Sequence, residues 1–222
     1  MLRILLALSF ILAVTYGIYG YDMYAGAPPY AFPAAFKASS IVILGVIALM
    51  QGPRLLTAAL LFGALGDALL AWSHDAFLYG ALAFLVGHLC YIALFLAHGI
   101  GVRQALGDRM RLLLLAVTVL AALAASQLTP HDSSMFVPLS VYSGVLTLMV
   151  LSSYTLPWSH RLAMLGAALF FISDGFVAWN MFHHDPDPAL AFWRSFAGWM
   201  IYWAGQAGLC FGALGLRAGA AK

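Results

Sequence analysis

Long apolar stretches alternate with short polar breaks along the whole chain. Each apolar stretch approaches or exceeds the roughly 20 mainly apolar residues that a helix needs to cross a membrane. The breaks are rich in Gly, Pro, Asp and His, which favour turns. The pattern predicts eight transmembrane helices, at residues 3–20, 34–51, 54–73, 76–98, 110–128, 135–153, 160–183 and 190–216.

The connections between these helices are short, and the longest has about a dozen residues, which is close to the usual loop length. We therefore expect an all-α fold in which residues 1–222 form a single polytopic membrane domain. The first apolar run could be read as a signal peptide, but it is longer than a usual signal core. We interpret it as the first retained membrane helix.

The composition supports a membrane protein. Of the 222 residues, 64% are hydrophobic and only 8% are charged, and the mean hydropathy is +0.95. A soluble domain of this size would need far more charge on its surface. The net charge of +2 includes no basic cluster, which argues against a nucleic-acid partner. Cys90 and Cys210 fall inside predicted helices and favour packing roles over a disulfide.

The basic residues are distributed unequally between the two sides of the predicted bundle. With a cytoplasmic N-terminus, eight of the ten fall inside, and only Lys37 and Arg194 fall outside. Because cytoplasmic loops carry an excess of Lys and Arg, we expect both termini in the cytoplasm. The corresponding location is the bacterial inner (plasma) membrane.

Two aspartates interrupt the apolar stretches. Asp67 and Asp174 each follow an arginine, Arg54 or Arg161, by 13 residues, and each begins an Asp-x-x-x-Ala-Trp pattern. An ionisable group in hydrocarbon costs about 2.5–3.5 kcal/mol on insertion scales, so such groups usually have a function. At 1.5 Å per residue, each aspartate lies about 20 Å from its arginine. Both are predicted at one depth, between the midplane and the outer face.

The two patterns are 107 residues apart and suggest a duplication into two halves of four helices in parallel orientation. Such repeats often build a site at their interface. A chance match in a sequence rich in Ala and Leu is the alternative interpretation.

Other polar side chains are predicted at a similar depth. They are Lys37, His88, Tyr91, Tyr142, Tyr202 and Gln206. Because buried polar groups in membranes face the bundle interior or one another, we expect a single polar pocket that opens outward and contains both aspartates. Simpler alternatives are interhelical hydrogen bonds for the aspartates, snorkelling to the interface for Lys37, and a core position for His88.

Metal binding is not favoured by the sequence. The densest ligand group is HHDPDP at 183–188, where two prolines oppose a regular coordinating frame. We expect no metal and no cofactor, with a metal-dependent lipid hydrolase as an alternative.

Several motifs together resemble the YhhN-like lysoplasmalogenase family of integral membrane hydrolases. They are Lys37, LGDALL at 65–70, FLVGHLCYIALF at 84–95, Pro138, Tyr142, GAALFFISDGFVAWNMF at 166–182 and YWAGQ at 202–206. One departure is Ala38, where the family often has proline. The resemblance implies an eight-helix, cofactor-free enzyme that cleaves the vinyl ether bond of lysoplasmalogen to a fatty aldehyde and a glycerophospho-base.

The residues suit that chemistry. Protonation of a vinyl ether gives an oxocarbenium ion that water captures, so one carboxyl can act as acid and the other as base. We expect Asp67 and Asp174 to be catalytic and the six other polar residues to bind a lysophospholipid drawn from the bilayer. Which aspartate is the acid, and the oligomeric state, stay open.

A proton-coupled transporter of a small or lipid-like solute is the main alternative, because intramembrane aspartates and repeats are also typical of carriers. Two features argue against it. The helices are not visibly broken, and the polar residues line only one half of the bundle. A purely structural protein is less favoured because of the insertion cost.

Overall fold

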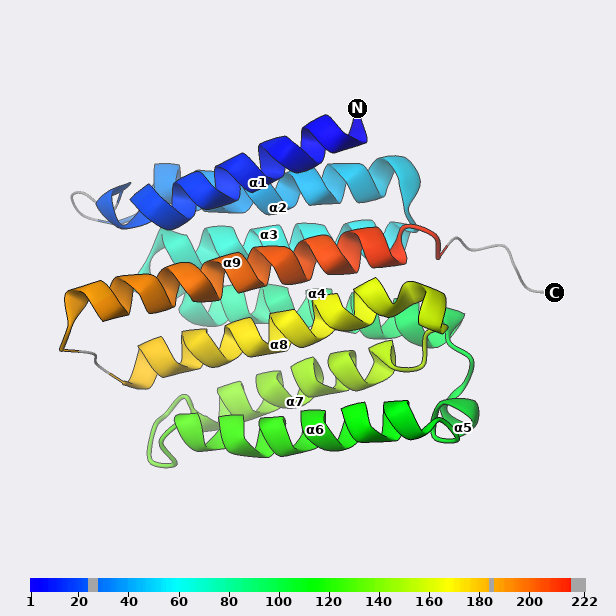
Figure 1. Cartoon of the computed structure of the whole chain (residues 1–222). Coiled ribbons are helices and arrows are strands. Elements are labelled where there is room, and N and C mark those ends of the chain that lie inside the picture. Colours follow the sequence, from blue (N-terminus) through cyan, green and yellow to red (C-terminus); the bar gives the residue numbers. More distant parts are fainter. Residues whose placement is uncertain (24–27, 184–185, 217–222) are drawn as a thin grey trace.

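The computed structural model describes all residues except 24–27, 184–185 and 217–222, together with the side chains of 21 and 22. All regular secondary structure in the described part is helical and there is no strand in it, which confirms the predicted all-α fold. The helices lie side by side in one bundle (Figure 1).

Eight long helices form this bundle, as predicted. They are α1 (Leu2–Tyr19), α2 (Ala31–Gln51), α3 (Arg54–Trp72), α4 (Phe77–His98), α6 (Arg109–Ala125), α7 (Phe136–Ser153), α8 (Arg161–Phe182) and α9 (Pro188–Ala213). The short α5 (Val102–Ala105) lies in the predicted break between the fourth and fifth long helices. Most boundaries lie within three residues of those expected, and the termini of helices fray by about that much.

Within the described residues, seven helical segments are long and apolar enough to cross a membrane, which makes the chain a multi-pass membrane protein. The long helix outside this set is α9, whose Trp, Tyr, Gly and Gln residues reduce its apolar character. It packs against α8 and also contacts α1, α2 and α3. By contrast, α6 leaves large apolar side chains such as Leu113 and Leu120 exposed on the side of the bundle, as lipid contact requires.

Glycines bring paired helices close together in both halves. A Cβ on Gly87 of α4 would lie 3.1 Å from the carbonyl oxygen of Ala59, and one on Gly205 of α9 would lie 3.0 Å from that of Gly166. Gly166 follows Ala59 by 107 residues (166 − 59), which is also the separation of the two aspartates. Small residues allow such close approach between membrane helices. This correspondence agrees with the predicted repeat.

Contacts between the two halves also follow the repeat. The fourth long helix of the first half, α4, packs on α7, and its counterpart α9 packs on α2. Consequently α3 and α8, which carry Asp67 and Asp174, occupy equivalent positions in the two halves.

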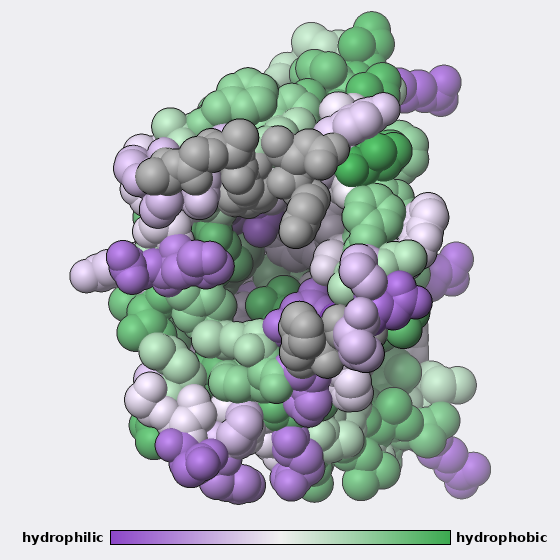
Figure 2. Space-filling view, turned by 90° about the vertical axis from the view of Figure 1, so that its left-hand side faces the viewer, coloured by the Kyte–Doolittle hydropathy of each residue, from purple (hydrophilic) through white to green (hydrophobic). Residues whose placement is uncertain are grey.

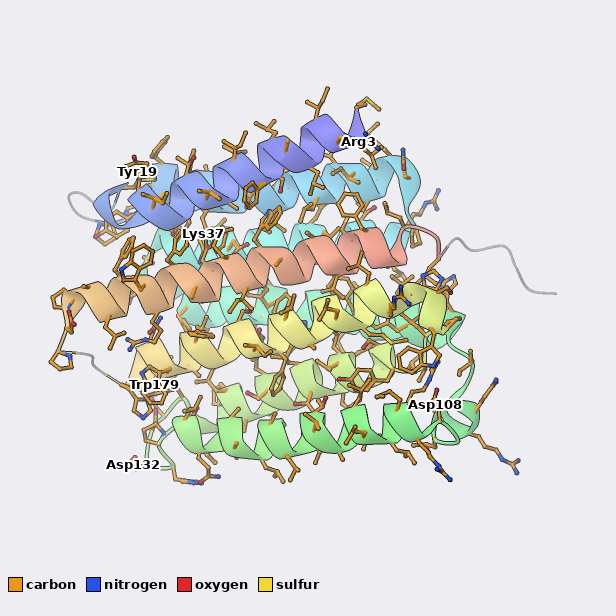
Figure 3. The ribbon with its side chains drawn as sticks, viewed as in Figure 1. Arg3, Tyr19, Lys37, Asp108, Asp132 and Trp179 are labelled. Carbon is orange, nitrogen blue, oxygen red and sulfur yellow. The ribbon has the colours of Figure 1, made fainter. Side chains whose placement is uncertain are left out.

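The two ends of the bundle differ in their residues. Figure 3 shows Arg3 and Asp108 at one end, and Tyr19, Asp132 and Trp179 at the other. Lys37 lies toward this second end, which we call the outer end after the sequence prediction. Arg217 and Lys222, two of the eight basic residues predicted inside, lie outside the described residues.

At the inner end, Asp108 joins the start of α6 to the α7–α8 connection. Its carboxylate accepts hydrogen bonds from the backbone N–H of Met110 (2.9 Å) and from the Trp158 indole (2.8 Å). It also forms a 3.2 Å ion pair with Arg111, whose guanidinium donates to the carbonyl oxygen of Tyr154. Arg111 was expected among the basic residues of the inner side, and the structure adds that it is buried. These contacts clamp α6, which otherwise packs mainly on α7.

Loss of the Asp108 carboxylate should destabilise this clamp. We expect Asp108→Ala to lower the melting temperature in detergent by several degrees, because it removes a helix cap and leaves the buried Arg111 without its partner. The exposed Asp132→Ala is the control. Differential scanning fluorimetry measures both.

The difference in melting temperature between wild type and Asp108→Ala should depend on pH. The hydrogen bond from Trp158, followed by those from Arg111 and Met110, holds the pKa of the Asp108 carboxyl below its ordinary value of 3.8. A lowered pKa stabilises the fold above the ordinary value, and the effect is lost as the pH falls through the folded-state pKa. The difference in melting temperature between wild type and Asp108→Ala should therefore narrow as the pH falls below the ordinary pKa and through the folded-state pKa. An unchanged gap at low pH would contradict an ionic clamp.

Candidate functional site

A cavity of about 610 Å³ penetrates the outer end of the bundle. Figure 2 looks onto this end and shows a hollow near its centre, surrounded by a rim of mixed polar and apolar residues. Five of the eight predicted site residues line the cavity. They are Lys37, Asp67, Tyr142, Asp174 and Tyr202.

Asp67 of α3 is buried and is held by two neighbouring helices. Its Oδ1 lies 3.7 Å from Nζ of Lys37 on α2, and its Oδ2 accepts a 2.7 Å hydrogen bond from the Tyr202 hydroxyl on α9. Gln206 donates to the Tyr202 hydroxyl at 3.1 Å, and Tyr91 of α4 donates to the Gln206 carbonyl at 2.9 Å. A continuous polar network from three other helices therefore fixes the carboxylate.

Asp174 of α8 has a second, shorter network. The Tyr142 hydroxyl of α7 donates to its Oδ2 at 2.5 Å, and the same hydroxyl lies 3.2 Å from Nε2 of His88 on α4. Because Tyr142 gives its single proton to Asp174, the arrangement requires Nε2 of His88 to be the donor in their contact. The Nδ1 atom of His88 is then an unprotonated nitrogen, and it has no hydrogen-bond partner among the described residues.

The two carboxyl groups thus occupy similar places with different partners. Lys37 is six residues after the start of α2, and Tyr142 is six residues after the start of α7. Lys37 and Tyr142 are therefore at equivalent positions of the repeat. As a result, a cation faces Asp67, whereas a phenol faces Asp174. An adjacent cation favours the ionised form of a carboxyl group, whereas a neutral donor provides less charge compensation.

Helical spacing and small residues explain how the site is assembled. Tyr202 and Gln206, four residues apart, share one face of α9. A Cβ on Gly63 would lie 2.7 Å from the Gln206 side chain, and a Cβ on Gly66 would lie 2.5 Å from Phe84. Glycine before Asp67 is therefore needed for α3 to approach α4.

Three predicted site residues, His88, Tyr91 and Gln206, do not line the cavity. They lie buried behind its wall. His88 contacts Tyr142, Gln206 contacts Tyr202, and Tyr91 donates to Gln206. Our assignment of these three to direct substrate contact stays a prediction, and their positions suit orientation of Tyr142 and Tyr202.

Sequence analysis missed most of the cavity wall. Further polar lining residues include Ser140, Ser143, Thr147, Asn180 and Ser195. Ser140, Ser143 and Thr147 are spaced by three and four residues, so one polar stripe along the sixth predicted helix could have revealed them. Arg194 reaches the outer rim, where its Nε donates to Oδ1 of Asn180 at 2.6 Å.

The structure gives little indication of a metal centre. Among the described residues, no three His, Cys, Asp or Glu side chains gather as potential ligands. Positions 184 and 185 of the HHDPDP segment lie outside the described residues. Cys90 and Cys210 are free thiols, in agreement with the expected packing roles.

Comparison with known proteins gives relatives that are named lysoplasmalogenase. A protein of Mycobacterium bovis named lysoplasmalogenase is 33% identical over 175 residues, which are 73% of this chain and 65% of that protein. Lysoplasmalogenase TMEM86B of Mus musculus is 37% identical over 129 residues, which are 58% of this chain and 51% of that protein. Its counterpart in Homo sapiens is 31% identical over 156 residues, or 68% of this chain and 64% of that protein.

These matches span about half to two thirds of the length of the curated relatives. No solved structure matches the chain significantly. The sequence model of the YhhN family matches residues 32–213, a range that includes all eight predicted site residues. The chain therefore belongs to the YhhN family.

Proposed function

We propose that this protein is a lysoplasmalogenase-like hydrolase. It cleaves the vinyl ether bond of a lysoplasmalogen and releases a fatty aldehyde and a glycerophospho-base. The observation that carries the proposal is the convergence of Asp67 and Asp174 on one cavity within the membrane bundle. The family membership and the names of the relatives support the same reaction.

The reaction needs one acid, one water molecule and one base. A carboxylic acid protonates the β-carbon of the vinyl ether, and the positive charge moves to the neighbouring carbon and the ether oxygen. Water adds to that carbon while a carboxylate removes its proton. The hemiacetal then collapses to the aldehyde, and its hydroxyl proton leaves with the glycerol oxygen. Proton exchange between the two carboxyl groups, through water, restores the starting state.

The partners of the two carboxyl groups suggest their roles. Asp67 faces the Lys37 cation, and we assign it as the ionised group that stabilises the oxocarbenium ion and accepts the proton from water. Asp174, whose Oδ2 accepts from the neutral Tyr142, is assigned as the proton donor. Tyr142 and Tyr202 orient the two groups, and Lys37 limits the net charge within the cavity.

The proposed substrate is a lysophospholipid taken from the bilayer. The cavity reaches the outer end, so a headgroup can remain near water while the vinyl ether bond lies beside the carboxyl groups. We also propose that the protein lies in a bacterial inner membrane. Both termini are placed in the cytoplasm on the basis of the distribution of basic residues.

A transporter is less well supported. Between the cavity and the inner end, the bundle is packed with fully buried side chains, among them Leu56, Leu94, Phe95 and Met149. A carrier needs a path from both sides, and this packed half favours an enzyme that exchanges substrate and products on one side.

Replacement of either carboxyl group by an amide should nearly abolish aldehyde release. General acid or base catalysis contributes typically 10²- to 10⁴-fold, so Asp67→Asn and Asp174→Asn should each lower kcat by at least about 100-fold. Purified protein is incubated with lysoplasmalogen, and the aldehyde is measured. The saturated-ether analogue, which cannot be protonated at carbon, is the substrate control.

Retained melting temperature in both variants shows that folding is intact. Wild-type activity in either variant would refute the two-carboxyl mechanism.

Chemical rescue separates the roles of the two groups. In Asp174→Gly, protonated acetic acid should replace the missing proton donor and restore part of the activity, so rescue grows as the pH falls. In Asp67→Gly the acetate anion replaces the base, so rescue grows as the pH rises. The opposite pair of trends would exchange the two assignments.

Isotope labelling checks the position of protonation. In D₂O, the aldehyde should carry one deuterium on the carbon next to the carbonyl, because this carbon receives the proton. In H₂¹⁸O, the glycerophospho-base should contain no ¹⁸O, because the carbon–oxygen bond on the aldehyde side breaks. Mass spectrometry of both products measures this, and ¹⁸O in the glycerol product would exclude the proposed path.

A further inference from the structure

The cavity extends sideways as well as outward. Its wall includes apolar side chains of three helices, which are Val119 and Leu123 of α6, Leu148 of α7, and Val177 and Met181 of α8. Leu123, Leu148 and Val177 are also 60%, 57% and 45% exposed. The polar end with both aspartates therefore continues into an apolar arm that is open between these helices.

Helix packing explains this arm. In the first half, α2 and α3 make one of the most extensive contacts of the bundle. The equivalent pair in the second half, α7 and α8, makes a much smaller contact, and α6 packs chiefly on α7. The gap is therefore specific to the second half and is not a general consequence of the repeat.

Two glycines lie at this gap beside the reacting groups. Gly144 is two residues after Tyr142, and Gly175 directly follows Asp174, and both line the cavity. Among the described glycines inside the long helices, these two alone have no atom within 4 Å of a built Cβ. Glycine in a helix interior costs about 1 kcal/mol relative to alanine. Close helix packing accounts for glycine elsewhere in the bundle, and at these two positions it does not.

Charge is placed to match a single-chain lipid. The Asp67–Lys37 pair and the rim residue Arg194 lie at the outer, polar part of the cavity, whereas the arm between α7 and α8 is apolar. A volume of about 610 Å³ is within the range that holds a molecule of drug or lipid-fragment size. The guanidinium of Arg194 at the rim suits a phosphate group, and the arm suits a hydrocarbon chain.

We propose that the gap between α7 and α8 is a side entrance through which the hydrocarbon chain of a single-chain lipid reaches the carboxyl groups from the bilayer. Gly144 and Gly175 set its width. The lipid class rests on the proposed function, whereas the path rests on the geometry alone.

Larger side chains at the two glycines should close this entrance without disturbing the fold. Gly144→Leu and Gly175→Leu each place a side chain in open space, and leucine also favours a helix. We expect kcat/KM for a long-chain lysoplasmalogen to fall at least tenfold. A short-chain, water-soluble vinyl ether of glycerophosphate, which enters from the outer end, should keep more than half of its kcat/KM.

A control isolates the effect of place. Ala121→Leu adds bulk on an exposed α6 position that does not line the cavity. It should retain wild-type kinetics with both substrates. Equal loss for the long and short substrates, or no loss for the long one, would overturn the side entrance.

A binding experiment keeps the proposal testable if the reaction is a different one. A saturated lysophospholipid with a diazirine in its chain is photo-crosslinked to wild-type protein in vesicles, and labelled peptides are identified. Labelling of α7 and α8 that is lost in Gly144→Leu supports the entrance even without vinyl ether hydrolysis. Labelling unaffected by both leucine variants refutes the entrance, whatever the enzyme's activity.

Discussion

Two carboxyl groups inside a membrane bundle require partners, and this requirement organises the outer half of the protein. Asp67 draws Lys37 from α2 and Tyr202 from α9, and Asp174 draws Tyr142 from α7. The two tyrosines are supported in turn, Tyr142 by His88 of α4 and Tyr202 by Gln206 of α9. An unpaired charge would cost several kcal/mol in this setting. The hydrogen bonds and the ion pair therefore offset part of the cost of burying the two carboxyl groups.

The same requirement explains the division of the bundle into two halves of different character. Toward the inner end, apolar side chains and closely packed glycines fill the space, as in the α8–α9 contact at Gly212 and Ala163. Toward the outer end, polar side chains keep the helices apart and leave a cavity. A closed inner half gives rigid support, while the open outer half admits a ligand from one side.

Much of this could be predicted from sequence. Apolar length predicted the eight long helices, because a membrane imposes one dimension on each of them, and the cost of buried polar groups indicated one shared pocket. The other residues of the cavity wall could not be predicted, and neither could the fact that Lys37 lines the cavity while His88 lies behind its wall. Both depend on which helices become neighbours. The exposed Gly144 and the tightly packed Gly87 look alike in sequence, and only packing separates them.

Function can arise where the two halves of the repeat differ. Two identical halves would present two equivalent carboxyl groups, and nothing in their surroundings would assign the acid role to one rather than to the other. Here Lys37 in α2 is matched by Tyr142 in α7, which gives the aspartates different partners. The close α2–α3 contact is matched by the open α7–α8 pair, which gives the cavity one apolar arm. Both departures fall at the same depth. A lipid chain entering beside Gly175 therefore brings its reacting bond first to Asp174, the group to which we assign proton donation.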